Sequence, residues 1–285
     1  METKNALERM SNAYHRLTRS GRKIADYILA HRTEAQYMSI TALAEECGVA
    51  DATVSRFCRT LGFDGYNDFK LALAKAVGVP AGEQPGVHGQ ILPEDSITEL
   101  GRKLYAADTA AIAQTLALMD EDAVRRAVEL LSAARRVYCF GQGGSMVMAM
   151  EAWARFATVA AQFQCIQDSH MQAMAASLAD EQDVILYISY SGSTKDMMDV
   201  LRLARERGVK IVLVTHFAKS PAASESDVVL LCGSKEGPLQ SGSVAAKMAL
   251  LFVIDILFHE YCRANPELTD INRETTANAL ANKLL

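Results

Sequence analysis

The sequence predicts an α/β protein, in which an all-helical N-terminal part precedes a parallel sheet covered by helices on both faces. Up to residue 78 the apolar residues recur only at helical spacing. From residue 136 onward short apolar runs alternate with helical segments, which is typical of a parallel sheet between two helical layers. Residues 79–96 hold three of the six prolines, which indicates a linker. We therefore predict a first domain at 1–78, the linker at 79–96 and a second domain at 97–285.

The segment ITALAEECGVADATVSRFCRTLGF in the first domain has the pattern of two helices joined by a short turn. The first helix is expected from Ile40 to Cys47 and the second from Asp51 to Leu61, with Gly48 in the turn. Five apolar residues would pack these helices together: Leu43, Ala44, Val49, Val54 and Phe57. The open side of the second helix could lie in a DNA major groove, and it carries Ala52, Thr53, Ser55, Arg56, Arg59 and Thr60. The alternative is an ordinary helical hairpin with a solvated charged face.

The second domain begins with helical patterns over roughly residues 94–133, and strand patterns follow. Apolar runs predict strands at 136–141, 184–189, 210–215 and 227–232, with a weaker run at 162–167. In parallel sheets ligands bind beyond the carboxyl ends of the strands, where loops lead into helices. The loops after the strands are therefore the places to look for a site.

Two of these loops are rich in glycine and hydroxyl groups. In GQGGSMVMA, the glycines Gly141, Gly143 and Gly144 allow close backbone approach to a ligand, and Ser145 would start a helix. A dinucleotide fingerprint is excluded, because its third glycine falls at Met146. The second loop, SYSGST, presents Ser189, Ser191, Gly192, Ser193 and Thr194 at the next helix start. Such a set suits a small phosphate monoester, although a single loop of this kind often only ends a strand and caps a helix.

These motifs resemble the two phosphosugar motifs of the sugar isomerase (SIS) domain. The resemblance rests on G-x-G-x-S-x-x-x-A from Gly141 to Ala149 and on S-x-S-G-x-T from Ser189 to Thr194, and it extends over about residues 125–265. It implies a five-stranded parallel α/β/α sandwich, in which the long apolar segment AAKMALLFVIDILFHEY resembles the closing helix of the family. It also implies that Ser189, Ser191 and Thr194 hold the phosphate and that Ser145 lies near the sugar.

The first domain resembles the helix-turn-helix domain of RpiR/MurR-type bacterial transcriptional regulators, which join it to a SIS domain in this order. The similarity runs from LTRSGRKIADYILAH through SITALAEECGVADATVSRFCRTLGFDGYNDFKLALA. Two positions depart from the family pattern. Gly21 stands where a glutamate would complete a capping box with Thr18, and Ala50 stands where a serine would cap the second helix. We expect Asp51 to cap in place of Ala50.

The resemblances imply a DNA-binding transcriptional regulator whose SIS domain senses a phosphorylated sugar and alters operator binding. DSHMQ and ISYSGS look closest to regulators of amino-sugar phosphates such as N-acetylmuramic acid 6-phosphate. The alternative is an aldose–ketose phosphosugar isomerase, which needs a base beside the sugar. We expect His170 to be a polar contact to the sugar rather than that base. His216 is equally consistent with a structural role, and Glu236 with a contact to sugar hydroxyls or with solvent; no enzymatic activity is expected.

The charge distribution, the cysteines and the absence of long apolar runs indicate which partners, metals and cellular compartment to expect. The net charge is −5, with +2 on residues 1–78 and −7 on the remainder. A helix-turn-helix domain of such low charge makes few phosphate contacts, so we expect a homodimer or homotetramer that joins through the closing helix. Six cysteines without a Cys-x-x-Cys pair predict buried thiols, and neither a metal site nor a cofactor is expected. The absence of a long apolar run and of a signal-peptide pattern predicts a cytoplasmic protein without membrane contact.

Overall fold

The computed structural model describes residues 5–77, 91–234 and 243–281. The chain forms two compact units, of which the first runs to Ala107 and the second contains Asp108–Ser234 and the chain from Val244. Most of the predicted linker and Glu236 lie outside the described residues. The predicted domain boundaries therefore stay predictions. No helix in the described ranges has the length and apolar character needed to cross a bilayer.

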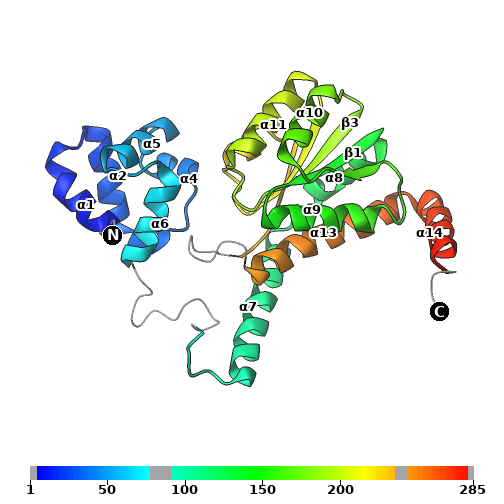
Figure 1. Ribbon diagram of the computed structural model, residues 1–285, viewed down its shortest axis with the longest axis horizontal. Coiled ribbons are helices and arrows are strands. Elements are labelled where there is room, and N and C mark those ends of the chain that lie inside the picture. The colour runs from blue at the N-terminus through cyan, green and yellow to red at the C-terminus, as the bar shows by residue number, and fades with distance from the viewer. Residues whose placement is uncertain (1–4, 78–90, 235–242, 282–285) are drawn as a thin grey trace. The chain divides into compact units, whose positions relative to one another are not determined.

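Residues 5–77 of the first unit contain helices and no strand, as predicted (Figure 1). Its elements are α1 (Ala6–Ala13), the 3-10 helix η1 (Tyr14–Arg16), α2 (Arg19–Ala30), α3 (Arg32–Ala35), α4 (Ile40–Glu46), α5 (Asp51–Thr60) and α6 (Tyr66–Val77). The apolar residues that recur at helical spacing meet in one core, which includes Ile24, Ile28, Leu43, Val54, Phe57 and Phe69. This packing fixes α4 and α5 against each other.

The turn between α4 and α5 has the predicted glycine in a left-handed conformation. Gly48 has a φ of +60°, which a residue with a side chain rarely adopts, and Val49 N donates to Ala44 O at 2.9 Å. Ser39 caps α4 through a 3.0 Å bond from Ala42 N, whereas Ala50 offers α5 no side-chain cap. The prediction that Asp51 caps α5 is wrong. Asp51 is already the first helical residue, and its carboxylate accepts from the hydroxyl of Thr41 on α4 instead.

The second unit contains the predicted five-stranded parallel sheet, in the order β2-β1-β3-β4-β5. Its strands are β1 (Arg136–Gly141), β2 (Phe163–Cys165), β3 (Asp183–Ile188), β4 (Lys210–Thr215) and β5 (Val228–Leu231). The helices are α8 (Glu121–Ala133), α9 (Gly144–Phe156), α10 (Ser169–Leu178), α11 (Lys195–Glu206), α12 (Pro221–Ser224), α13 (Val244–Ala264) and α14 (Pro266–Ala281). Helix α7 (Ile97–Ala117) leads into this unit.

Helices cover both faces of the sheet, so the fold is an α/β/α sandwich (Figure 1). One layer consists of α8, α9 and α13 and packs through Leu131, Phe156 and Leu257. The other consists of α10, α11 and α12 and packs through residues such as Met197 and Leu201. Since α9 follows β1 and α11 follows β3, the chain leaves these two neighbouring strands toward opposite faces.

An ion-pair cluster closes the amino end of β3, at the opposite edge from the loops. The carboxylate of Asp183 is fully buried and accepts from Arg136 at 2.7 Å and from Arg135 at 2.9 Å. Burial by itself would raise the pKa of Asp183, but the hydrogen bonds from Arg136 and Arg135 outweigh it and lower that pKa to about 2. Asp183 therefore stays ionised and joins β3 to the start of β1.

Candidate functional site

The two glycine and hydroxyl loops meet at the carboxyl ends of β1 and β3. These strands are neighbours in the sheet, and Gly141 pairs with Ile188 in register. The strand order reverses direction here, which is the place where open α/β sheets bind ligands. A hydrogen bond from Thr194 Oγ1 to Gln142 Oε1, 3.0 Å long, joins one loop to the other. The two loops, whose bonded residues are 52 positions apart in the sequence, thus lie side by side.

The first loop is shaped by its glycines. A Cβ on Gly141 would lie 2.7 Å from Ser145 O, so only glycine allows the strand to turn into α9 at this point. Gly143 has a φ of +54° and is exposed. Ser145 is half-buried in the first turn of α9, where its own N–H donates to Gln142 O at 3.0 Å and the N–H of Met146 donates to Gly143 O at 3.1 Å. This loop therefore combines an open backbone with one nearby hydroxyl.

In the second loop the first serine is buried, and the residues that follow it are closer to the surface. Ser189 is buried, and its hydroxyl accepts from Gly192 N at 3.2 Å. Gly192 has a φ of +57°, and a Cβ there would lie 2.1 Å from Ser220 Oγ. Ser191 and Ser193 are half-buried and Thr194 is exposed. The structure thus assigns Ser189 a part in shaping the loop, and leaves three other side chains of the motif at the surface.

Thr194 occupies the N-cap position of α11 without capping the helix through its side chain. A threonine in this place ordinarily accepts from a backbone N–H of the first turn. Here its hydroxyl donates across to Gln142. The N–H groups at the start of α11 consequently have no partner from the Thr194 side chain, which leaves them suited to an anionic ligand.

His216 and His170, the two histidines near the predicted site, differ in their contacts and in their exposure to solvent. His216 stacks on Tyr190 with ring centroids 5.0 Å apart, and its Nδ1 donates to Cys232 O at 2.9 Å. His170 lies in the first turn of α10, with its side chain 94% exposed and its Nδ1 3.9 Å from Asp168 Oδ1. His216 is thus packed against the second loop, whereas His170 is an exposed polar group at the start of α10.

The predicted DNA-reading residues share the open side of α5. Val54, Phe57 and Cys58 are buried in the core of the first unit. The six predicted residues lie on the remaining face, half-buried or exposed: Ala52, Thr53, Ser55, Arg56, Arg59 and Thr60. Thr60 uses its hydroxyl to donate to Arg56 O within the helix, and Arg56 Nη2 lies 3.4 Å from Thr53 Oγ1. Arg56 and Arg59 are both exposed and supply the cationic groups of this face.

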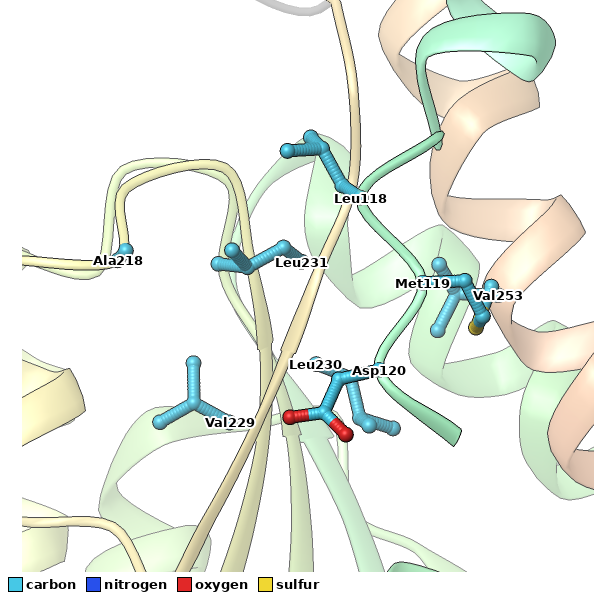
Figure 2. Close-up of a pocket in the computed structure, with 8 residues that line it drawn as sticks. All are labelled: Leu118, Met119, Asp120, Ala218, Val229, Leu230, Leu231 and Val253. Atoms are coloured by element: carbon cyan, nitrogen blue, oxygen red, sulfur yellow. The ribbon is translucent and has the colours of Figure 1, made fainter. Parts of the chain in front are cut away.

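A cavity of about 160 Å³ lies elsewhere in the second unit, beside the edge strand β5. Figure 2 shows its lining, which is almost wholly apolar: Leu118, Met119, Asp120, Ala218, Val229, Leu230, Leu231 and Val253. The Asp120 carboxylate is negative and already accepts from two N–H groups at the start of α8. This cavity is therefore unsuited to a phosphate, unlike the loops after β1 and β3.

Comparison with known proteins identifies both domains. Residues 4–78 match the family model of the rpiR-family helix-turn-helix domain, and residues 130–260 match that of the SIS domain. An HTH-type transcriptional regulator of Caldanaerobacter subterraneus is 32% identical, over 88% of this chain and 87% of its own length. The HTH-type transcriptional regulator HexR of Escherichia coli K12 is 31% identical over 89% of this chain and 86% of its own. The chain belongs to the rpiR family of transcriptional regulators.

Solved structures agree with this membership. The Vibrio vulnificus NanR protein, complexed with ManNAc-6P, is 28% identical, with a TM-score of 0.88 over 99% of this chain and 100% of its own. A putative sugar-phosphate isomerase from Listeria monocytogenes, 16% identical with a TM-score of 0.57, shares the fold alone. The predicted fold class and family are confirmed, and this protein is a transcriptional regulator with a helix-turn-helix and a SIS domain.

Three polar residues of the regulator lie at the loops but were not singled out from the sequence. Gln142 receives the hydroxyl of Thr194. Gln172, on the buried face of α10, donates to Gly141 O at 3.1 Å and Ile166 O at 2.8 Å and so holds the ends of β1 and β2. Lys247 on α13 lies with its Cε 3.8 Å from the position of a Cβ on Gly144. A signal was present for Gln172 alone, since it shares a helical face with the apolar Ala176.

Proposed function

We propose that the SIS domain of this regulator binds a phosphorylated sugar at the loops after β1 and β3, and that binding alters its affinity for operator DNA. The observation that carries this is the joining of the two loops through Thr194 and Gln142 at the switch point of the sheet. The 28% identity to NanR over nearly the whole chain supports an amino-sugar phosphate such as N-acetylmannosamine 6-phosphate.

Each loop residue has a role in this proposal. Ser191, Ser193 and Thr194 donate hydroxyl protons to phosphate oxygens, and the N–H groups at the start of α11 add backbone donors. Ser189 accepts from Gly192 N, which leaves its own proton available to the phosphate from below. Gly143 and Gly192 permit close approach, and Ser145 and His170 contact the sugar. Glu236, which lies outside the described residues, is kept as a predicted sugar contact.

We propose further that α5 reads the operator through Arg56 and Arg59, assisted by Ala52, Thr53, Ser55 and Thr60. A single domain with few cationic groups needs a second copy, so the working form is a homodimer or homotetramer whose heads contact half-sites about 34 Å apart or a multiple of that. Part of α13 supports assembly, because its outward face keeps apolar side chains partly exposed: Met248, Leu251, Phe252 and Ile256. A regulator that binds operator DNA acts where the DNA is, so we propose that this protein acts in the bacterial cytoplasm.

The rival function is isomerisation of an aldose phosphate. The relatives that cover most of the chain are named transcriptional regulators, which supports a sensor without enzymatic activity. The setting of His216, fixed by Tyr190 and Cys232, also supports this, because that ring is held as part of the loop packing. Isomerisation requires a base that can reach a carbon-bound proton of the sugar. A turnover assay detects the isomer that such a base would produce.

A thermal-shift panel tests the proposal. The full-length protein is heated with N-acetylmannosamine 6-phosphate, N-acetylmuramic acid 6-phosphate, glucose 6-phosphate and the unphosphorylated sugars. A true effector at 100 times its dissociation constant stabilises the folded state by about 2.7 kcal/mol, whereas unphosphorylated sugars are expected to have little effect. Conversion of the stabilising sugar phosphate into its isomer during prolonged incubation would favour the enzyme instead.

A further inference from the structure

Gln142 carries two hydrogen-bonding groups at the junction of the loops, and only one of them is engaged. Its Oε1 accepts from Thr194 Oγ1 at 3.0 Å. Its Nε2 is buried and has no hydrogen-bond partner within the described part of the chain. Buried amide groups are paired in the great majority of cases, so an unpaired donor here requires an explanation.

Rearrangement of the amide does not remove the unpaired group. A 180° flip of the Gln142 amide group would place Nε2 against Thr194 Oγ1 and leave Oε1 without a partner. The two nearby backbone oxygens do not bond it either: Gly141 O accepts from Gln172 Nε2 at 3.1 Å and Gln142 O from Ser145 N at 3.0 Å. An oxygen from outside the chain, placed between the loops, would satisfy the donor.

We propose that Gln142 is an effector-binding residue, whose Nε2 donates to a phosphate oxygen of the bound sugar phosphate. The inference rests on the proposed function and adds a contact that the hydroxyl motifs do not include. The Thr194 hydroxyl has one proton, which it gives to Gln142 in the present arrangement. On binding, this proton turns to the phosphate, and the internal bond between Gln142 and Thr194 is exchanged for two bonds to the effector.

The sign of a substitution separates this role from a purely internal one. If Gln142 only held Thr194 away from the ligand, its removal would free the threonine and tighten binding. If Gln142 donates to the effector, Gln142→Ala weakens binding about tenfold or more, as expected for a lost hydrogen bond to a charged group. Gln142→Glu keeps an acceptor for Thr194 but places a carboxylate beside the phosphate, so it weakens binding further, and this added loss shrinks at high ionic strength.

Titration calorimetry with N-acetylmannosamine 6-phosphate, or with whichever panel member stabilises the wild type, measures these affinities in the full-length protein. Gln182→Glu is the matched control, because it makes the same charge change at an exposed position at the amino end of β3. We expect the control to bind like the wild type, and all variants to unfold near the wild-type temperature.

The outcomes distinguish the two proposals. Unchanged or tighter binding in both Gln142 variants, with weaker binding in Ser191→Ala, would overturn the role of Gln142 and leave the proposed site intact. A wild-type protein that binds no sugar phosphate would overturn the proposed function and this inference together. Weaker binding in Gln142→Ala and still weaker binding in Gln142→Glu, with the control unaffected, establishes Gln142 as a ligand residue.

Discussion

The hydroxyl of Thr41 on α4 donates to the carboxylate of Asp51 on α5 at 2.8 Å, and this bond joins the two helices of the helix-turn-helix unit. Asp51 directly follows Ala50, the position at which the family pattern has a serine that would cap α5. Thr41→Val should leave a partly buried carboxylate without this donor and lower the stability of the first domain by about 1–2 kcal/mol. Chemical denaturation measures the change. Thr60→Val removes only a bond on the exposed face of α5, so it should have a smaller effect, and equal effects would contradict the inferred role of Thr41.

Ala50→Ser should stabilise the first domain. Ala50 already has the extended conformation of an N-cap residue, with φ −83° and ψ 153°, and α5 has no side-chain cap. A serine there can accept from a backbone N–H of the first turn, which contributes about 0.5–2 kcal/mol. The same denaturation experiment checks this. A lower stability of the serine variant would show that the bond between Thr41 and Asp51 excludes a cap.

The ion pairs of Asp183 predict a dependence of stability on pH. Because its folded-state pKa is lowered to about 2, the contribution is fully present above the unfolded-state pKa of about 3.9 and is lost as pH falls toward 2. Asp183→Asn should therefore cost on the order of 2 kcal/mol at neutral pH and flatten the stability curve between about pH 4 and pH 2. Denaturation across that range provides the measurement. Parallel curves for the two proteins would contradict the assignment.

Arg56 and Arg59 should contribute differently to DNA binding depending on what each contacts. An arginine on a guanine edge discriminates by about 1–3 kcal/mol, whereas one on a phosphate weakens all sequences alike and lowers the salt slope by about one. Fluorescence anisotropy with an operator selected from a random duplex library, at several salt concentrations, separates these cases for each alanine variant. Arg202→Ala, an exposed arginine on α11, is the control. Operator affinities equal to that of wild type in both variants would rule out α5 as the recognition helix.

The sequence predicted those features that depend on local pattern. Period and turn residues located α4, Gly48 and α5, and the alternation of apolar runs located all five strands. The second strand is shorter than its apolar run, because only Phe163–Cys165 pairs with β1. The strand ends where its pairing with β1 ends, and the apolar run contains no local signal for that position.

Side-chain partners at the site were not predictable in the same way. The bond between Thr194 and Gln142 joins residues 52 positions apart, and it exists because β1 and β3 are neighbours in the sheet. The motif alone does not distinguish Ser189 from Ser191, yet in the folded chain Ser189 is buried and its hydroxyl accepts from Gly192 N, whereas Ser191 is half-buried. Such differences arise from tertiary contacts and not from residue type.

The most direct test measures operator affinity with and without the stabilising sugar phosphate, in wild type and in Ser191→Ala together with Thr194→Ala. We predict that the sugar phosphate changes wild-type operator affinity by about 5- to 150-fold, which corresponds to a coupling free energy of about 1–3 kcal/mol. The double variant should bind the same operator normally in the absence of sugar and show no response to it. An identical response in the double variant, or no response of the wild type to any sugar phosphate of the panel, would contradict effector sensing at these loops.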